Sequence, residues 1–180
     1  MLTRHEVEKA RKRAVAMLDR IGIVLTPPER AQLEVVDEGL GDLDRIGLQI
    51  VTYVNTARCC AKEIVLFPDQ TCPQHRHPSH GDSPGKEETF RCRWGTVYLY
   101  VPGEPAPAPL ANPSRARYFS VWHQAVLQPG DQFTVYPGTW HWFQAGPEGA
   151  VVSEFSTSST DELDEFTDPE IKRFTVIVDE

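Results

Sequence analysis

Residues 71–104 read TCPQHRHPSHGDSPGKEETFRCRWGTVYLYVPGE, and this stretch joins a histidine pair to a long β-branched and aromatic run. His75 and His77 are separated by one residue, so on an extended strand both side chains point to the same face of the sheet. The run TVYLYV at 96–101 has the composition of a strand. The stretch therefore predicts strands that carry imidazoles on one face.

Similar short runs continue along the chain on both sides of this stretch, separated by turns rich in Pro, Gly and Asp. Strands so short and so regularly punctuated are typical of an all-β sandwich or barrel. The segment Pro102–Pro113 is too rich in proline for a central strand and is expected to form a surface loop. The other candidate strands are LQIVTYV (48–54), EIVLF (63–67), FTVYP (133–137), AVVSEFS (150–156) and FTVIV (174–178).

The N-terminal part of the chain has helical signals instead. Thr3 and Glu6 form a capping-box pattern, apolar residues then recur at helical spacing, and Gly22 stands where such a helix should stop. Thr26 and Glu29, with a proline after the threonine, mark the start of a second, short helix. These signals predict a helical arm ahead of the strands.

The bulk composition indicates one soluble domain of 180 residues, with about 1–45 as the helical arm and about 46–180 as the β-barrel. The net charge of −8 disfavours nucleic-acid binding, because an acidic surface repels phosphates, and favours a small, weakly charged partner. No apolar run approaches the roughly 20 residues that span a bilayer, and no secretory signal is visible. We therefore expect a cytoplasmic protein without a membrane partner.

The four cysteines also bear on the expected cellular compartment. Cys59, Cys60, Cys72 and Cys92 include no CxxC pair, so neither a zinc ribbon nor a thioredoxin-like site is indicated. Since cytosolic disulfides are rare, the four residues are interpreted as reduced structural thiols.

A metal-ligating pattern runs through the predicted strands. Glu88 lies eleven residues after His77, far enough for a loop and a returning strand, and His141 follows a Pro-Gly turn. A lone His-x-His pair is commonly a surface feature, but with Glu88 and His141 added the combination favours a metal site. Three imidazoles and one carboxylate leave two positions of a six-coordinate ion open, as a catalytic site requires. This ligand set, His75, His77, Glu88 and His141, suits manganese, iron, cobalt, nickel or zinc.

These residues resemble the two metal-binding motifs of the cupin superfamily. Glu88 and Gly95 have the six intervening residues that are usual in the first motif, and the distance from Gly130 to His141 is usual for the second. Some positions depart from the pattern, including Ala145 in place of the usual asparagine, but no ligand is lost. The interval before Glu88 is longer than usual and implies an enlarged loop over the metal.

A longer resemblance covers nearly the whole chain. The stretch 71–104 is similar to the signature block of the cupin-type D-lyxose isomerases, and so are GLGDLDRIGLQIVTYVN (39–55), PGTWHWFQAGPEGAVVSEFST (137–157) and TDPEIKRF (167–174). The resemblance implies a cupin β-barrel that interconverts D-lyxose with D-xylulose and D-mannose with D-fructose. It also implies that the protein is a homodimer that prefers Mn²⁺.

Aldose–ketose isomerisation needs a general acid and a general base near the metal. Lys86 stands two residues before Glu88, and its pKa is expected to fall beside a metal ion, which would suit a proton carrier. Glu154, in the strand-like VVSEFS, is the candidate base. The alternatives are a solvated loop lysine and an ordinary surface carboxylate.

Four further residues are candidates for sugar binding. Tyr98 shares the parity of Glu88 on the predicted strand, and Arg91 binds sugar hydroxyls only if its face of the strand is inward. Asp168 and Arg173 belong to the block TDPEIKRF and would reach back from the tail to the site of their own or a partner chain.

Two other functions use the same ligands. An oxygen-activating iron cupin is the first alternative, and a non-catalytic sugar- or metal-binding cupin is the second, because a fold does not fix a function. An isomerase is favoured by the acid–base residues expected around the metal.

Overall fold

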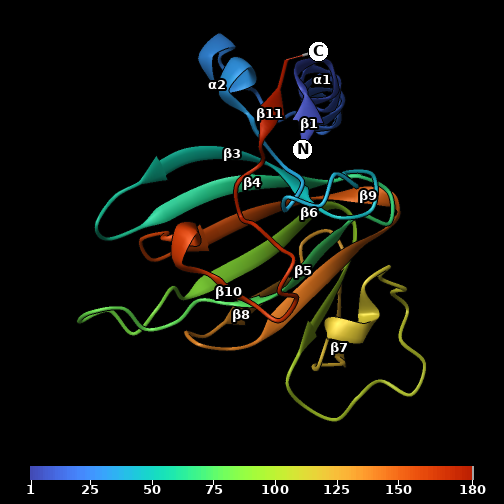
Figure 1. The fold of residues 1–180 in the computed structure, drawn as a ribbon, viewed down its shortest axis with the longest axis vertical. Helices are drawn as coiled ribbons and strands as arrows, with labels where there is room; N and C mark the ends of the chain where they lie inside the picture. The colour runs from blue at the N-terminus through green and yellow to red at the C-terminus, as the bar shows by residue number, and fades with distance from the viewer. Residues whose placement is uncertain (180) are drawn as a thin grey trace.

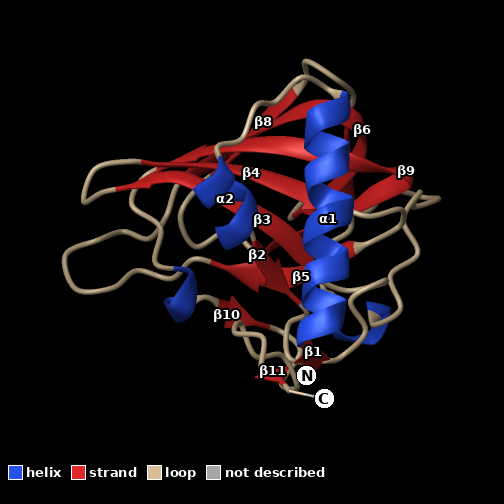
Figure 2. Ribbon diagram, turned by 90° about the horizontal axis from the view of Figure 1, so that it is seen from above, coloured by secondary structure: helices blue, strands red, loops and turns tan. Residues whose placement is uncertain are grey.

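The computed structural model describes residues 1–179, whose antiparallel strands curl into an open barrel with two helices across one outer face (Figures 1 and 2). The expected β-barrel with an N-terminal helical arm is confirmed. The elements in chain order are β1 (Leu2–Thr3), α1 (Arg4–Arg20), α2 (Pro27–Gln32), β2 (Glu34–Val36), β3 (Leu48–Asn55), β4 (Cys60–Leu66), β5 (Thr71–Arg76), β6 (Glu88–Val101), β7 (His123–Leu127), β8 (Gln132–Val135), β9 (His141–Ser156), β10 (Glu165–Phe166) and β11 (Ile177–Val178).

The long strand β9 organises the sheet. One of its edges pairs with β6 along most of its length, while the other pairs with β5 near its start and with β4 in its second half. The sheet continues from β4 through β3 to β2, and β6 also pairs with β7 and β8. Because one strand joins both sides, the sheet curls back over itself and encloses an interior.

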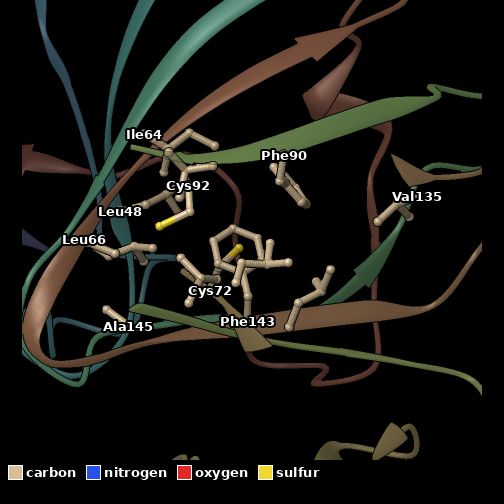
Figure 3. Packing of buried hydrophobic residues seen from close by; sticks show 14 of the residues in the cluster. Leu48, Ile64, Leu66, Cys72, Phe90, Cys92, Val135, Phe143 and Ala145 are labelled. Atoms are coloured by element: carbon tan, nitrogen blue, oxygen red, sulfur yellow. The ribbon is translucent and has the colours of Figure 1, made fainter. Parts of the chain in front are cut away.

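Three clusters of buried side chains pack on this curled sheet, one in its interior and two outside it. The interior cluster contains Phe90, Cys92 and Phe143, whose side chains meet between the strands in Figure 3. The second cluster joins α1 to the outer face of β3 and β4 and includes Leu18, which is fully buried. The helical arm is thus packed on the barrel (Figure 2). Among residues 1–179, no helix is long and apolar enough to cross a membrane.

The predicted helix signals are confirmed. Both capping boxes form, with Thr3 and Glu6 bonded reciprocally before α1 and Thr26 and Glu29 before α2. The first helix ends just before Gly22, whose φ of 78° lies in the left-handed region that favours glycine. The segment 1–45 is not wholly helical, however, because β2 lies within it and pairs with β3.

The C-terminal run FTVIV is shorter as a strand than predicted. Only Ile177–Val178 form β11, and they pair in parallel with β1 at the N-terminus. The two ends of the chain therefore lie side by side next to α1 (Figure 1). The last predicted strand therefore pairs with the N-terminal segment and is not part of the barrel sheet.

Strand β6 contains two register shifts opposite β9, one between Cys92 and Trp94 and one between Gly95 and Val97. Before them, Glu88 and other even-numbered residues face the interior; after them, odd-numbered residues such as Val97 do. An irregularity of this kind changes which face the following side chains occupy. The strand therefore has two halves with opposite inward parity.

Candidate metal centre

The four predicted ligands come together at the ends of three strands. His75 lies in β5, His77 follows that strand, Glu88 begins β6 and His141 begins β9. His75 and His141 are direct neighbours in the pairing of β5 with β9. All four residues are buried, and one ligand atom from each lies within 4.8 Å of the others. The fold thus converts a dispersed sequence pattern into a single cluster.

Hydrogen bonds orient the three imidazoles. Nδ1 of His75 lies 2.9 Å from the carbonyl oxygen of Pro73, and Nδ1 of His141 lies 2.9 Å from that of Thr139. Nδ1 of His77 lies 2.5 Å from Oδ1 of Asp164. Since each Nδ1 faces an oxygen acceptor, each ring keeps Nε2 as the metal-binding nitrogen, which is the usual arrangement around metal sites.

The hydrogen bonding and charge of the cluster suit a bound cation. Nε2 of His141 is buried without a hydrogen-bond partner, although it lies 2.9 Å from Oε1 of Glu88. Burial, together with His141 and His77, holds the pKa of His75 well below its ordinary value, so this ring is uncharged and can offer a nitrogen lone pair to a metal. Burial alone would raise the pKa of Glu88, but Lys86 and His77 hold it well below its ordinary value. Burial acts to lower the pKa of His77, but Glu88 and Asp164 raise it to about 9, so this ring holds a proton. A divalent metal would take the place of that proton, because a ligand imidazole is neutral, and neutral imidazoles around an ionised carboxylate suit such an ion.

Lys86 and Glu154 lie beside this cluster and are both buried. Nζ of Lys86 is 2.7 Å from Oε2 of Glu88 and 3.2 Å from Oε1 of Glu154. Burial alone would lower the pKa of Lys86, but Glu154, Glu88 and Asp161 raise it well above its ordinary value. Several carboxylates surround the ammonium group, and the fall in pKa that is expected beside a bound metal ion stays a prediction.

A second buried cation joins the same group of charges. Nζ of Lys62 lies 2.6 Å from Oδ2 of Asp161 and 3.8 Å from Oε1 of Glu154. Nη2 of Arg173, from the tail, lies 3.3 Å from the same oxygen of Asp161. Asp161 therefore contacts three cations, Lys86, Lys62 and Arg173. Burial acts to raise the pKa of Asp161, but these cations hold it well below the ordinary value.

A cavity that is partly open to solvent connects these groups. Apolar side chains, among them Phe90, Phe143 and Phe166, form part of its wall, and the polar part holds most of the charged residues described above. A cavity with an apolar wall and a few convergent polar groups is the usual form of a small-molecule site. Its polar and charged lining residues are Glu38, Lys62, His75, His77, Lys86, Glu88, Glu154, Asp161, Asp164 and Arg173.

Three predicted sugar-binding residues lie outside the lining of this cavity. Tyr98 follows the register shifts in β6 and packs on the outer face of the sheet against a third cluster, which is mainly aromatic and contains Tyr100, Phe119 and Trp142. Arg91 donates from Nη1 to Gln132 on β8 at 3.2 Å. Asp168 is buried against Arg115. Of the four candidates, the structure brings only Arg173 to the cavity.

Four lining residues were missed by the sequence analysis. Lys62 had a readable signal, because it shares the parity of inward-facing Ile64 on β4. Asp161 begins a short 3-10 helix (Asp161–Leu163) between β9 and β10, Asp164 follows it, and Glu38 lies between β2 and β3, so no strand alternation places them. These acidic residues had no motif that would have distinguished them from surface carboxylates.

The fold and the site together define a cupin-like metal-binding protein with a small-molecule cavity. A family model described as D-lyxose isomerase matches residues 110–180. The D-lyxose ketol-isomerase of Thermofilum sp. (strain ex4484_79) is 57% identical over 99% of this chain and 100% of its own length. The D-lyxose/D-mannose isomerase of Thermosediminibacter oceani is 54% identical, again over 99% of this chain and 100% of its own. The chain belongs to the D-lyxose isomerase family.

A solved structure of similar fold is the L-ribose isomerase of Cellulomonas parahominis without ligand. It has a TM-score of 0.82 and covers 98% of each chain at 16% sequence identity. The likeness shows that the curled sheet and its helical arm form a known arrangement.

Proposed function

We propose that this chain is an aldose–ketose isomerase that interconverts D-lyxose with D-xylulose and D-mannose with D-fructose. The observation that carries the proposal is the buried pair of Lys86 and Glu154, 3.2 Å apart, at the edge of the three-histidine, one-glutamate cluster. The names of the relatives, D-lyxose ketol-isomerase and D-lyxose/D-mannose isomerase, supply the sugars.

The reaction moves one proton between C1 and C2 of the open-chain sugar and another between their two oxygens. The chemistry that a divalent ion supplies at His75, His77, Glu88 and His141 is Lewis-acid polarisation of the sugar carbonyl. Glu154 is the base in this proposal: its carboxylate accepts the proton from C2 of the aldose and delivers it to C1 of the enediolate, while the proton of the C2 hydroxyl passes to O1, which gives the ketose. The intermediate is an enediolate, and the rest of the carbon skeleton does not change.

Lys86 acts as a hydrogen-bond donor in this scheme. Its ammonium group lies between the carboxylates of Glu88 and Glu154, so it can donate to a sugar oxygen that gains negative charge. Lys62 pairs with Glu154 and is itself held by Asp161, so both are positioning residues. Arg173, anchored by Asp161, is the lining residue from the tail that would donate to sugar hydroxyls.

We further propose Mn²⁺ as the metal and a homodimer as the assembly, as the resemblance to the family implies. The four cysteines of the chain are free thiols, three of them buried. Free thiols suit a reducing compartment, and the proposed location is the cytoplasm.

The proposal is tested by incubating metal-stripped protein with D-lyxose or D-mannose in D₂O, with and without added Mn²⁺. We expect ketose only with the metal, and deuterium at C1 of the ketose, because Glu154 exchanges its proton with solvent. Glu154→Gln should lower kcat by at least about 100-fold while Mn²⁺ binding stays unchanged, since a lost general base typically costs 10²–10⁴-fold.

Two results would contradict this function. Oxygen consumption with either sugar, without ketose, would indicate an oxygen-activating cupin. Glu154 would be excluded as the base by two observations made together. The ketose and the recovered aldose would contain no deuterium, and Glu154→Gln would leave the rate of ketose formation unchanged.

A further inference from the structure

Glu38 is a buried carboxyl group that the scheme above does not use. It lines the same cavity, its exposed fraction is 2%, and its Oε2 has no hydrogen-bond partner. Leaving a buried polar atom unpaired costs about 1–3 kcal/mol, so such atoms are uncommon in native structures. A carboxyl group of this kind that faces a cavity is suited to pair with a ligand in that cavity.

The backbone of Glu38 is held in a strained conformation. Its φ of 52° lies in the left-handed region, which costs a side-chain-bearing residue free energy and tends to occur at functional sites. The preceding Asp37 fixes this turn by accepting hydrogen bonds from the amides of Gly39 and Gly41 at 3.0 Å. The amide of Lys172 donates to the carbonyl oxygen of Glu38 at 2.9 Å. The turn therefore aims the side chain inward and keeps it there.

Glu38 lies on the side of the cavity that the tail forms. Its carbonyl oxygen accepts from the amide of Lys172, and the next residue, Arg173, lines the same cavity and is the first charged group that acts on its carboxyl group. Among the described residues, the charged side chains in contact with the four metal ligands are Lys86 and Asp164 and not Glu38, so a sugar with C1 and C2 at the metal cluster would meet Glu38 through a more distal hydroxyl.

We propose that the side chain of Glu38 is a substrate-binding group that hydrogen-bonds a sugar hydroxyl at C4 or beyond, next to Arg173. The inference rests on the proposed isomerase function and adds a specificity residue to it. Arg173 can only donate hydrogen bonds, while a carboxyl group can accept from a hydroxyl, so the two side chains offer complementary contacts to neighbouring hydroxyls.

The protonation of Glu38 suits this role. Burial raises its pKa to about 8, against the lowering effect of Arg173. Without metal, the group is then mostly a neutral acid at neutral pH, which can both donate and accept a hydrogen bond, and as the carboxylate that a dication favours it can still accept one. A sugar hydroxyl has the same two capacities, so the contact needs no change of charge.

The test compares Glu38→Gln and Glu38→Met in the Mn²⁺-loaded enzyme. The first variant keeps a side chain that donates and accepts, and the second keeps an unbranched chain without that capacity. The substrates are D-lyxose, its 4-deoxy and 5-deoxy analogues, and D-mannose. We expect Glu38→Met to raise KM for D-lyxose roughly tenfold, as for one lost hydrogen bond, with kcat within about threefold, and Glu38→Gln to stay within about threefold of the unsubstituted enzyme.

The deoxy sugars identify the contact. On the unsubstituted enzyme, one of the two analogues should lose roughly tenfold in kcat/KM, and Glu38→Met should add no further loss with that analogue, because partners in one contact are not additive. The matched control is Glu63→Met, since Glu63 is also buried with an unpaired oxygen and a raised pKa but lies outside the cavity lining. Its KM should not change.

The outcomes separate the two proposals. If the unsubstituted enzyme turns over neither sugar, the isomerase function fails. If it turns over D-lyxose and both deoxy analogues equally well, the hydrogen bond to a distal hydroxyl is excluded, even if Glu38→Met does not fold. Equal losses for Glu38→Met with all sugars, deoxy analogues included, would also overturn the inference.

Discussion

Among the described residues outside the ligand set, Asp164 is the carboxylate that contacts a ligand imidazole, with its Oδ1 2.5 Å from Nδ1 of His77. In Asp164→Asn the hydrogen bond loses its charge assistance and holds the ring less firmly. We expect Mn²⁺ affinity to fall about 10–100-fold, as for other metal-orienting carboxylates, which titration calorimetry on the stripped protein measures. Asp168→Asn is the control, because Asp168 pairs with Arg115 away from the cluster. Equal affinities for the two variants would rule out an orienting role.

Glu38 also makes stability depend on pH. Its pKa is raised to about 8 by burial, with Arg173 opposing and Asp164, Asp37 and Glu34 reinforcing. The folded state then holds a proton that the unfolded state releases above pH 4.5, so stability falls as pH rises from about 4.5 to 8.

Relative to Glu38→Gln, the free energy of unfolding of metal-stripped protein should therefore fall by about 1.4 kcal/mol per pH unit in this window. Urea titrations at pH 5, 6, 7 and 8 measure the difference. Metal is removed because a dication in the cavity would favour the carboxylate. Parallel pH profiles of the two proteins would contradict the raised pKa.

Single residues were predictable from sequence where a strand placed them. The four metal ligands follow from strand geometry and motif spacing, and Glu154 shares its inward parity with Ala150 and Val152 on β9. Asp161, Asp164 and Glu38 come from connections between strands, where side-chain direction depends on tertiary contacts that no local pattern encodes. Lys62 lies on a strand, so its inward direction could have been predicted from the parity of β4, but the sequence analysis did not include it.

At the scale of elements, the irregular segment of β6 is the feature most sensitive to substitution. Gly95 has a φ of 74°, and a Cβ there would lie 2.0 Å from the carbonyl oxygen of Gly149. Gly95→Ala must displace one of the two paired backbones, and we expect a loss of about 3 kcal/mol or more in unfolding free energy, measured by urea denaturation.

Gly138→Ala is the matched control for this prediction. Gly138 has a similar φ of 72°, but nothing lies within 4 Å of the added Cβ. Only the conformational cost of about 1–2 kcal/mol should remain. If both substitutions cost the same, the close approach of β6 to β9 does not matter for stability.

The helices were predicted more completely than the strands for a physical reason. Capping boxes are local, so Thr3 and Thr26 identify helix starts without knowledge of the rest of the chain. The pairing of β11 with β1 joins the two ends of the sequence, and the register shifts in β6 depend on β9. Tyr98 was assigned to the wrong face because its parity with Glu88 holds only for a strand without such shifts.

At the scale of the whole molecule, the metal cluster ties together strands that are distant along the chain. Ligands from β5, β6 and β9, and Asp164 behind them, meet only in the folded state. Metal binding should therefore stabilise folding, by about 2.7 kcal/mol when free Mn²⁺ is 100 times its Kd. Thermal denaturation with Mn²⁺ and with a chelator measures this effect. His141→Gln should abolish most of the metal-dependent shift, and an undiminished shift would place the metal elsewhere.

The change of parity in β6 has a practical consequence for directed evolution of this enzyme. A library that randomises every second position from Glu88 onward would vary the cavity at first, and then, beyond Gly95, the outer aromatic wall. A library meant to alter sugar preference should therefore vary Phe90 and leave the metal ligand Glu88 unchanged. Tyr98 and Tyr100 belong to a separate design, aimed at the packing of the barrel wall.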